Sequence, residues 1–419
     1  GWVVMGGEVG VPEGMRRWVE VNDFMLKLGL PLFIEADVGK LDGNWFGDVM
    51  GLMEGIVKHG YNPFGVLNSV AHKMVAGSKP LKLASTFQSL YVGLTPNRPG
   101  STLSTVSPAL FGLLSAMEMI GSKRDVEEGR RKIHGVHYVE GGFGTIVKGI
   151  VRLLEDRNVD IRVGRGVERI EECKDERGGV LVDGERFDAV VCNVEVDKAN
   201  DGLISSPRPP PPKKIMSSSV LQFHWIVEGE EAKNKLRAHN VFLSDDNVGS
   251  WDAVRAGDPS IKLENDGERR EKIQQPPFNF YVHNPGCGDD TACVGGGTVL
   301  MALVPIAAGS KITKKEVKQW EGWVKQRVEK RTGGLNLLHS ECTTPKKWEE
   351  DYGLPGGAVF GAAHGLLQLG PTRQGCNVPG MKGCFYVGAS KRPGNGVPLV
   401  MIGAEKTALE VVKYLKRHF

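Results

Sequence analysis

A glycine-rich turn near the C-terminus carries the residue types best suited to holding a ligand. Its sequence, at residues 388–398, is GASKRPGNGVP. Gly394 and Gly396 remove side chains at points where a backbone has to approach a ligand closely. Pro398 fits the first turn of a helix, whose free N–H groups and positive dipole end would then face the turn. Such a turn would stabilise an anionic or electron-rich group; an ordinary tight connection between strand and helix is the alternative.

The elements beside this turn are typical of an α/β domain. Residues 384–387 predict a short apolar strand, and residues 397–417 predict a long helix with one apolar side. Upstream, an apolar helical face over residues 145–155 precedes the alternating Val159, Ile161 and Val163, which predict a strand. Helices that alternate with strands build an α/β sheet, and ligands bind where the strands of such a sheet end.

The remaining segments predict helices first and a mixed α+β region later. Helices are expected over residues 13–28, 45–57, 63–75 and 313–331. Further strands are expected over residues 180–182, 190–192, 220–227, 240–243, 278–283 and 298–304. The sequence PRPPPP at residues 207–212 cannot continue a helix or a central strand, so it marks a domain crossing or an exposed loop.

Composition and charge exclude several functional classes. The 53 basic and 50 acidic residues nearly cancel, so no nucleic-acid partner is expected. The seven cysteines lack Cys-x-x-Cys spacing and indicate neither a disulfide framework nor a zinc site. The longest apolar run, residues 299–308, is too short to span a bilayer. The sequence has no nucleophile elbow or metal-spaced cluster, and we interpret His364 as structural, so the catalytic residues stay unknown and no metal is expected.

Several short motifs resemble the phytoene desaturase family of bacteria and fungi. FYVGAS at residues 385–390 and RPGNGVP at residues 392–398 resemble its C-terminal signature. The other motifs, in chain order, are FQSLYVG (87–93), YVEGG (138–142), VERI (167–170), AVVCN (189–193), YVH (281–283), VP (304–305) and GAVFG (357–361). The resemblance therefore extends from about residue 13 to the C-terminus.

The resemblance implies an FAD-dependent oxidoreductase that acts on CH–CH bonds in carotenoid biosynthesis, with hydride transfer from a polyene hydrocarbon to the flavin. It also implies an α/β FAD-binding domain, Rossmann-like and of the GR2 type, with a discontinuous α+β substrate domain. The expected parts are a mostly helical substrate part (1–134), an FAD part (135–200), an α+β substrate part (201–374) and a C-terminal FAD part (375–419). The implied cofactor-binding residues are Gly141, Gly142, Val167, Asn193, Gly388, Ala389, Pro393, Gly394, Gly396, Val397 and Pro398. The implied substrate residues are Phe87, Gln88 and Tyr91.

The sequence departs from the family pattern in three places. Position 139 is Val where the family usually has Pro, and residues 122–132 form a charged insertion that we expect to be exposed and dispensable. The Gly-x-Gly-x-x-Gly fingerprint is missing, so we expect the first βαβ unit to be absent and the chain to be N-terminally incomplete. GGEVG at residues 6–10 has the wrong spacing to replace it. We therefore expect the 419-residue chain to bind FAD poorly and to leave an apolar sheet position unpaired.

A phytoene-like carotenoid substrate demands an apolar channel and access to a bilayer. Candidate channel-lining or membrane-facing side chains, for which plain helix core is the alternative, are Trp45, Phe46, Met50, Met53, Phe64 and Met74. The resemblance implies a peripheral membrane location, on the cytoplasmic side or in a plastid-type compartment. The alternatives in function are a related FAD oxidoreductase (carotenoid isomerase, retinol saturase or amine oxidase) and a catalytically empty polyene-binding fragment.

Overall fold

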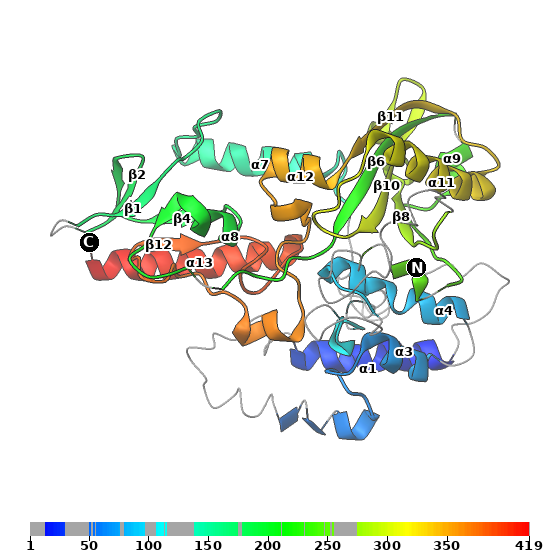
Figure 1. The fold of residues 1–419 in the computed structure, drawn as a ribbon, viewed down its shortest axis with the longest axis horizontal. Helices are drawn as coiled ribbons and strands as arrows, with labels where there is room; N and C mark the ends of the chain where they lie inside the picture. The colour runs from blue at the N-terminus through cyan, green and yellow to red at the C-terminus, as the bar shows by residue number, and fades with distance from the viewer. Residues whose placement is uncertain are drawn as a thin grey trace, which may run out of the picture.

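The computed structural model describes residues 13–29 and 275–418, and most of residues 50–96, 106–114 and 138–254. The expected insertion at residues 122–132, the glycines at residues 6–10, and Trp45 and Phe46 lie outside the described residues. Figure 1 shows three regions: helices near the N-terminus, a large antiparallel sheet, and a region where smaller sheets lie between two long helices.

The large sheet is antiparallel and has the strand order β11-β6-β10-β8-β7, with β9 paired to β10. Its strands are β6 (Ser219–Glu228), β7 (His239–Phe242), β8 (Phe280–His283), β9 (Cys293–Val294), β10 (Gly297–Ile306) and β11 (Leu337–Thr343). Alternate residues of β6 and β10 are buried, as expected for a sheet with one face packed on a core. The predicted strands over residues 220–227, 240–243, 278–283 and 298–304 are thereby confirmed.

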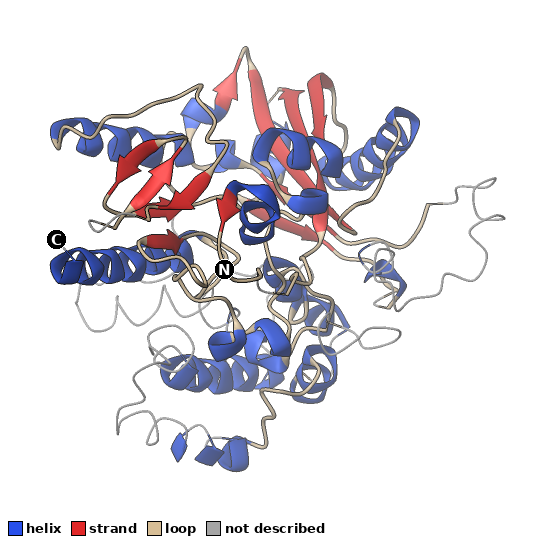
Figure 2. Cartoon of the chain, turned by 60° about the vertical axis from the view of Figure 1, so that its left-hand side comes forward, coloured by secondary structure: helices blue, strands red, loops and turns tan. Residues whose placement is uncertain are grey.

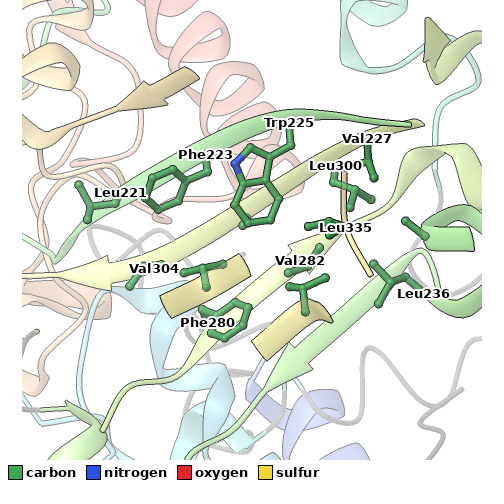
Figure 3. Close-up of a cluster of buried hydrophobic side chains, with 14 of the residues drawn as sticks. Leu221, Phe223, Trp225, Val227, Leu236, Phe280, Val282, Leu300, Val304 and Leu335 are labelled. Carbon is green, nitrogen blue, oxygen red and sulfur yellow. The ribbon is translucent and has the colours of Figure 1, made fainter. Parts of the chain in front are cut away.

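One face of this sheet carries the main hydrophobic core. Cross-strand neighbours such as Trp225 and Leu300 pack side by side, and Figure 3 shows these side chains gathered together. The helices α9 (Glu231–Lys235) and α11 (Lys314–Thr332) contribute to this core, where Val324 and Val328 of α11 are fully buried. A capping box between Thr313 and Glu316 fixes the start of α11, which confirms the helix predicted over residues 313–331.

The helical region surrounds a small core of its own. It contains α1 (Glu13–Gly29), α3 (Leu67–Met74), α4 (Lys79–Ala84) and the 3₁₀ turns η2 (Phe87–Val92) and η3 (Ala109–Gly112). Trp18 of α1 packs edge-on against Tyr61, whose hydroxyl donates to Asn22 of the same helix. Burying an aromatic ring whose polar end has a partner is favourable, and it ties α1 to the chain that enters α3.

The third region contains a parallel pair of strands. Its elements are α7 (Phe143–Asp156), β1 (Ile170–Glu172), β2 (Val180–Val182), β3 (Glu185–Phe187), β4 (Val190–Cys192), α8 (Val196–Lys198), β5 (Ile204–Ser205), β12 (Cys384–Tyr386) and α13 (Val397–His418). Strands β3, β2, β1 and β5 form one sheet in that order, and β12 pairs in parallel with β4. In Figures 1 and 2, α7 and α13 lie on opposite sides of β4 and β12. The proline-rich stretch at residues 207–212 joins β5 to β6 of the large sheet.

The strand predicted at Val159, Ile161 and Val163 is wrong. Residues 157–169 have no regular structure, and the exposed fractions of these three side chains are 46%, 42% and 86%. An alternating pattern becomes a strand only when a neighbouring strand supplies hydrogen bonds, and among the described residues no strand lies beside this segment.

Candidate functional site

The loop between β12 and α13, residues 387–396, has the backbone of a binding turn. Gly388, Gly394 and Gly396 have φ values of 121°, 146° and 94°, which side-chain-bearing residues rarely adopt. A Cβ at Gly388 would stand 2.9 Å from Asn193 Oδ1, and one at Gly394 would overlap Nε2 of His364. Among the described residues, nothing lies within 4 Å of where a Cβ at Gly396 would stand. Gly388 and Gly394 therefore serve the packing of the protein itself, whereas Gly396 faces open space.

The loop contacts the segment predicted to bind substrate. Asn395 Nδ2 donates a hydrogen bond of 2.7 Å to the carbonyl of Tyr91, and the His364 N–H donates to the carbonyl of Val92 at 3.4 Å. Of the predicted substrate residues, Phe87 and Gln88 are buried in η2 and Tyr91 is partly buried. The structure therefore brings the glycine-rich loop and η2 together, although they are 304 residues apart at the Tyr91–Asn395 contact.

An aromatic cluster adjoins this contact. The ring of Phe87 lies 6.1 Å from Tyr91 and 6.4 Å from Trp251, measured between ring centroids. Tyr281 and Phe360 pack against the same cluster. Aromatic faces of this kind suit an extended apolar ligand, because they offer large contact areas with little conformational freedom to lose.

A buried polar group lies beneath the loop. Ser390 Oγ donates to Glu195 Oε2 at 2.5 Å and accepts the N–H of Ala362 at 2.8 Å. Burial raises the pKa of Glu195, and it lowers the pKa of Lys391, whose Nζ donates to the carbonyl of Gly403 at 3.0 Å. Ser390 and Lys391 lie in motifs recognised from the sequence, but their contacts with Glu195 and Gly403 are visible only in the packed structure.

His364 lies against the loop backbone at Gly394. It is 2% exposed, and within the described residues neither ring nitrogen has a hydrogen-bonding partner. Burial, reinforced by the charge of Arg373, lowers its pKa well below the ordinary value. The imidazole is therefore neutral at physiological pH and packs edge-on against Phe111, which favours the structural interpretation of His364.

The other predicted cofactor residues lie in two places. Gly141 and Gly142 precede α7, where the N–H of Gly141 donates to Asp289 Oδ2 at 2.8 Å, as does the hydroxyl of Tyr138. Val167 is 47% exposed and lies in the irregular segment before β1. These residues therefore surround α7 and the segment that follows it, whereas Asn193 contacts the glycine-rich loop.

The remaining loop residues lie along the start of α13. The carbonyl of Ala389 accepts a hydrogen bond from Arg373, Pro393 packs against Gly403, and Val397 is 42% exposed. Pro398 occupies the second position of α13, and the helix begins with the N–H of Val400 donating to Gly396 at 2.9 Å. The helix start faces the open space beside Gly396, as a ligand-binding turn requires.

A groove of about 640 Å³ lies away from this loop. Its lining includes Glu410, Tyr414 and His418 in the last turns of α13, together with Arg208 and Lys382. Because the glycine-rich loop precedes the first turn of α13, this groove belongs to the opposite end of the helix. Within the described residues, no group of three or more His, Cys, Asp and Glu side chains could hold a metal ion.

Comparison with known proteins shows what this chain resembles. Residues 98–247 match the family described as flavin containing amine oxidoreductase. That range includes α7, β1 to β4 and β6, and the match supports an FAD-binding fold for this part of the chain. The expectation of FAD as cofactor agrees with this match.

The chain is also similar to several phytoene desaturases, and the predicted resemblance is confirmed. It is 28% identical to phytoene desaturase of Phycomyces blakesleeanus over 80% of this chain and 54% of that protein. It is 26% identical to the zeta-carotene-forming phytoene desaturase of Myxococcus xanthus, over 77% of this chain and 58% of that protein. The crystal structure of an oxidoreductase from Methanosarcina mazei aligns with a TM-score of 0.49 at 14% identity, covering 88% of this chain and 73% of that one. The chain thus spans little more than half the length of the curated relatives it matches.

Proposed function

We propose that this chain provides the flavin-ring end and the substrate channel of an FAD-dependent carotenoid desaturase. The observation that carries the proposal is the hydrogen bond from Asn395 to Tyr91, which holds the glycine-rich loop against the aromatic segment η2. FAD, when bound, supplies a two-electron acceptor for a hydride from a polyene C–H bond. The relatives named as phytoene desaturases support a phytoene-like hydrocarbon as the substrate.

The residues of this chain would then position the reactants and exclude water. The open surface beside Gly396 has room for the edge of a planar ring, and no Cβ projects into it. Phe87 and Trp251 are fully buried, so within this cluster the partly buried Tyr91 is the ring that would reach an extended hydrocarbon, and Phe87 would support it from within the core. Each new double bond would require loss of a hydride to the flavin and of a proton from the neighbouring carbon to water or a nearby base. These residues would hold the hydrocarbon in place while both leave.

We propose further that a strand–helix–strand unit completes the cofactor domain and that the described residues do not supply it. The helix α7 has no buried residue, and its apolar side chains Val147, Ile150 and Leu153 are 60%, 49% and 54% exposed. Among the described strands, β4 has only β12 beside it, and Val191 of β4 is 47% exposed. Parallel sheets are normally covered on both faces, so these surfaces support a missing layer.

The same argument implies that the described residues hold only part of FAD. They provide the turn between β12 and α13 for the ring, but the described residues contain no second strand–glycine turn–helix, with Gly-x-Gly-x-x-Gly spacing, for the pyrophosphate. We therefore expect the 419-residue chain to bind FAD weakly and a fusion that adds such a unit to bind it stoichiometrically. A flavin spectrum of each purified protein tests this, and stoichiometric FAD in the 419-residue chain would contradict it.

Membrane association is also a proposal. Among the described parts of the chain, no helix is long and apolar enough to cross a bilayer. Met50, Met53 and Val57 are spaced three and four residues apart, and their exposed fractions are 53%, 51% and 82%. Such a stripe on one side of a helix would rest on a lipid surface. Flotation with liposomes should carry the protein upward, and the M50Q/M53Q/V57Q variant should remain at the bottom.

The reaction itself is tested with phytoene dissolved in liposomes, using the fusion that carries the added unit. A desaturase lengthens the conjugated system, so the product absorbs at longer wavelength than the substrate. A carotenoid isomerase would leave the number of double bonds unchanged, and an amine oxidase would leave phytoene intact. An unchanged polyene in the presence of bound FAD would overturn the desaturase proposal and favour one of these alternatives.

A further inference from the structure

Arg373 is a buried arginine whose whole guanidinium is engaged by backbone carbonyls. It is 3% exposed and follows the short turn η10 (Gly370–Thr372). Its nitrogens donate to the carbonyls of Lys391 (3.1 Å), Ala363 (3.3 Å), Gln368 (3.1 Å), Ala362 (2.9 Å) and Ala389 (2.6 Å). Two of these carbonyls belong to the glycine-rich loop, and three belong to residues 362–368. A single side chain thus joins the two segments.

A second contact reinforces the same junction. Ser390 accepts the N–H of Ala362 and donates to Glu195, whose other oxygen accepts the N–H of Val196 at 3.0 Å. Burial lowers the pKa of Arg373 to about 10, so the side chain stays charged near neutral pH, and the charge of Glu195 favours this. The turn after β4, the glycine-rich loop and residues 362–368 are therefore linked through two polar side chains, Arg373 and Ser390.

This geometry differs from that of an ordinary buried arginine. An arginine that pairs with one carboxylate uses two of its N–H groups. A lysine in its place keeps the positive charge but loses the planar arrangement of N–H donors. Here the acceptors lie on separate backbone segments, so a lysine with its single nitrogen cannot reach them together. The loop carbonyls at residues 389 and 391 depend on the guanidinium for their partners, because an unpaired buried carbonyl is costly.

We propose that Arg373 is a positioning residue that fixes the glycine-rich loop, and through it the Asn395–Tyr91 contact, in the geometry needed for the flavin ring. Arg373 lies behind the loop, on the side of residues 362–364, and acts through the backbone rather than on a ligand. The role in holding a flavin rests on the proposed function. The role in fixing the loop rests on the hydrogen bonds alone.

The test compares Arg373→Lys with Arg327→Lys. Arg327 is a matched control, since it also donates to two carbonyls, those of Phe278 and Leu243, but within the large sheet. Hydrogen–deuterium exchange of the 419-residue chain, followed by mass spectrometry, reports on the loop without any cofactor. We expect Arg373→Lys to raise exchange at residues 387–396 and 87–92 by about tenfold, and Arg327→Lys to leave these residues unchanged. Equal exchange of the loop in the wild type and Arg373→Lys would overturn the inference.

Two further measurements separate the inference from the proposed function. If Arg373→Lys fails to fold, Ser390→Ala removes the second contact of the same junction, and the same rise in loop exchange is expected. FAD titration of the fusion with the added nucleotide-binding unit then tests the cofactor role. Faster loop exchange with unchanged FAD affinity would support the positioning role of Arg373 and contradict the assignment of this loop to the flavin.

Discussion

At the scale of single residues, Gly394 and Gly396 show that two positions of one motif can require glycine for different physical reasons. The sequence predicted that both make room for a ligand. The structure gives Gly394 a neighbour within the protein, the ring of His364, whereas Gly396 borders open space. No spacing rule could separate these two cases, because His364 reaches the loop only through the tertiary fold.

This difference predicts different outcomes for two matched substitutions in a protein that binds FAD. Gly394→Ala should destabilise the fold by about 1–3 kcal/mol through overlap with His364. Gly396→Ala should cost a similar amount through its positive φ and in addition weaken FAD binding about tenfold or more. Thermal unfolding and flavin titration measure the two effects separately. Unchanged FAD affinity in Gly396→Ala would contradict the proposal that the flavin ring lies beside this loop.

His364 gives a prediction about pH. Because burial lowers its pKa in the folded state, the unfolded chain binds more protons as the pH falls below about 6.5. The stability that depends on a neutral His364 is thus complete above that pH and is lost as the pH falls toward the lowered pKa. His364→Gln should flatten the fall of unfolding free energy in this range by up to about 1.4 kcal/mol per pH unit. The control is exposed His339→Gln, which should keep the wild-type slope, and equal slopes in all three proteins would contradict the prediction.

At the scale of elements, α7 and residues 157–169 show that a sequence pattern predicts a helix more reliably than a strand, because it does not say whether a neighbouring strand is present. The apolar face of residues 145–155 correctly predicted the helix, because helical hydrogen bonds are made within the segment itself. The alternation of Val159, Ile161 and Val163 wrongly predicted a strand, because strand hydrogen bonds come from a neighbour. The large sheet was predicted well for the same reason: its strands have their neighbours among the described residues.

The exposed face of α7 predicts that one substitution has opposite effects in the 419-residue chain and in the fusion that adds a strand–helix–strand unit. Ile150→Glu should leave the unfolding temperature of the 419-residue chain unchanged and reduce its aggregation, because this side chain is 49% exposed. In the fusion that adds a strand–helix–strand unit, the same change should destabilise by about 2 kcal/mol, because a charge would be placed in a covered apolar face. Light scattering and thermal unfolding of both proteins measure this. Lys148→Glu also adds negative charge to α7, but at an exposed polar position, so it is the control for the effect of charge alone.

Asp289 carries the attachment of α7 to the large-sheet region. It accepts from Thr291, from the N–H of Gly141 and from the hydroxyl of Tyr138, and these hydrogen bonds lower its pKa to about 2. A lowered carboxyl pKa means that the attachment is complete above about pH 4 and weakens as the pH falls toward 2. Asp289→Asn should therefore increase hydrogen exchange in the first turn of α7 at neutral pH and remove its acid dependence. Asp290→Asn, at the neighbouring exposed carboxylate, should change neither.

At the scale of the whole molecule, motifs predicted the class and the loop, whereas packing determined how they are held. The co-linear motifs identified the relatives that comparison confirmed. The contact between Asn395 and Tyr91 was found only in the structure. The motifs did not reveal Arg373 and Glu195, nor the contacts that Ser390 makes, because these hydrogen bonds join segments that only the tertiary fold brings together. The domain boundaries at residues 134, 200 and 374 stay a prediction.

The parallel pair β4 and β12 also determines the order in which the parts of this protein can fold during synthesis. Val190 and Cys384 are partners in register, so 194 positions of chain separate two residues that pair. Ribosomes add about 5–20 residues per second, and a nascent chain therefore waits about 10–40 s between the synthesis of β4 and that of β12. During this interval the complete antiparallel sheet can form, since all its strands lie between the two. During this time the apolar strand Val190–Cys192 has no β12 to pair with, so its edge is open to aggregation. We therefore expect chaperones, or early termination of synthesis, to affect the yield of folded protein most strongly in this interval.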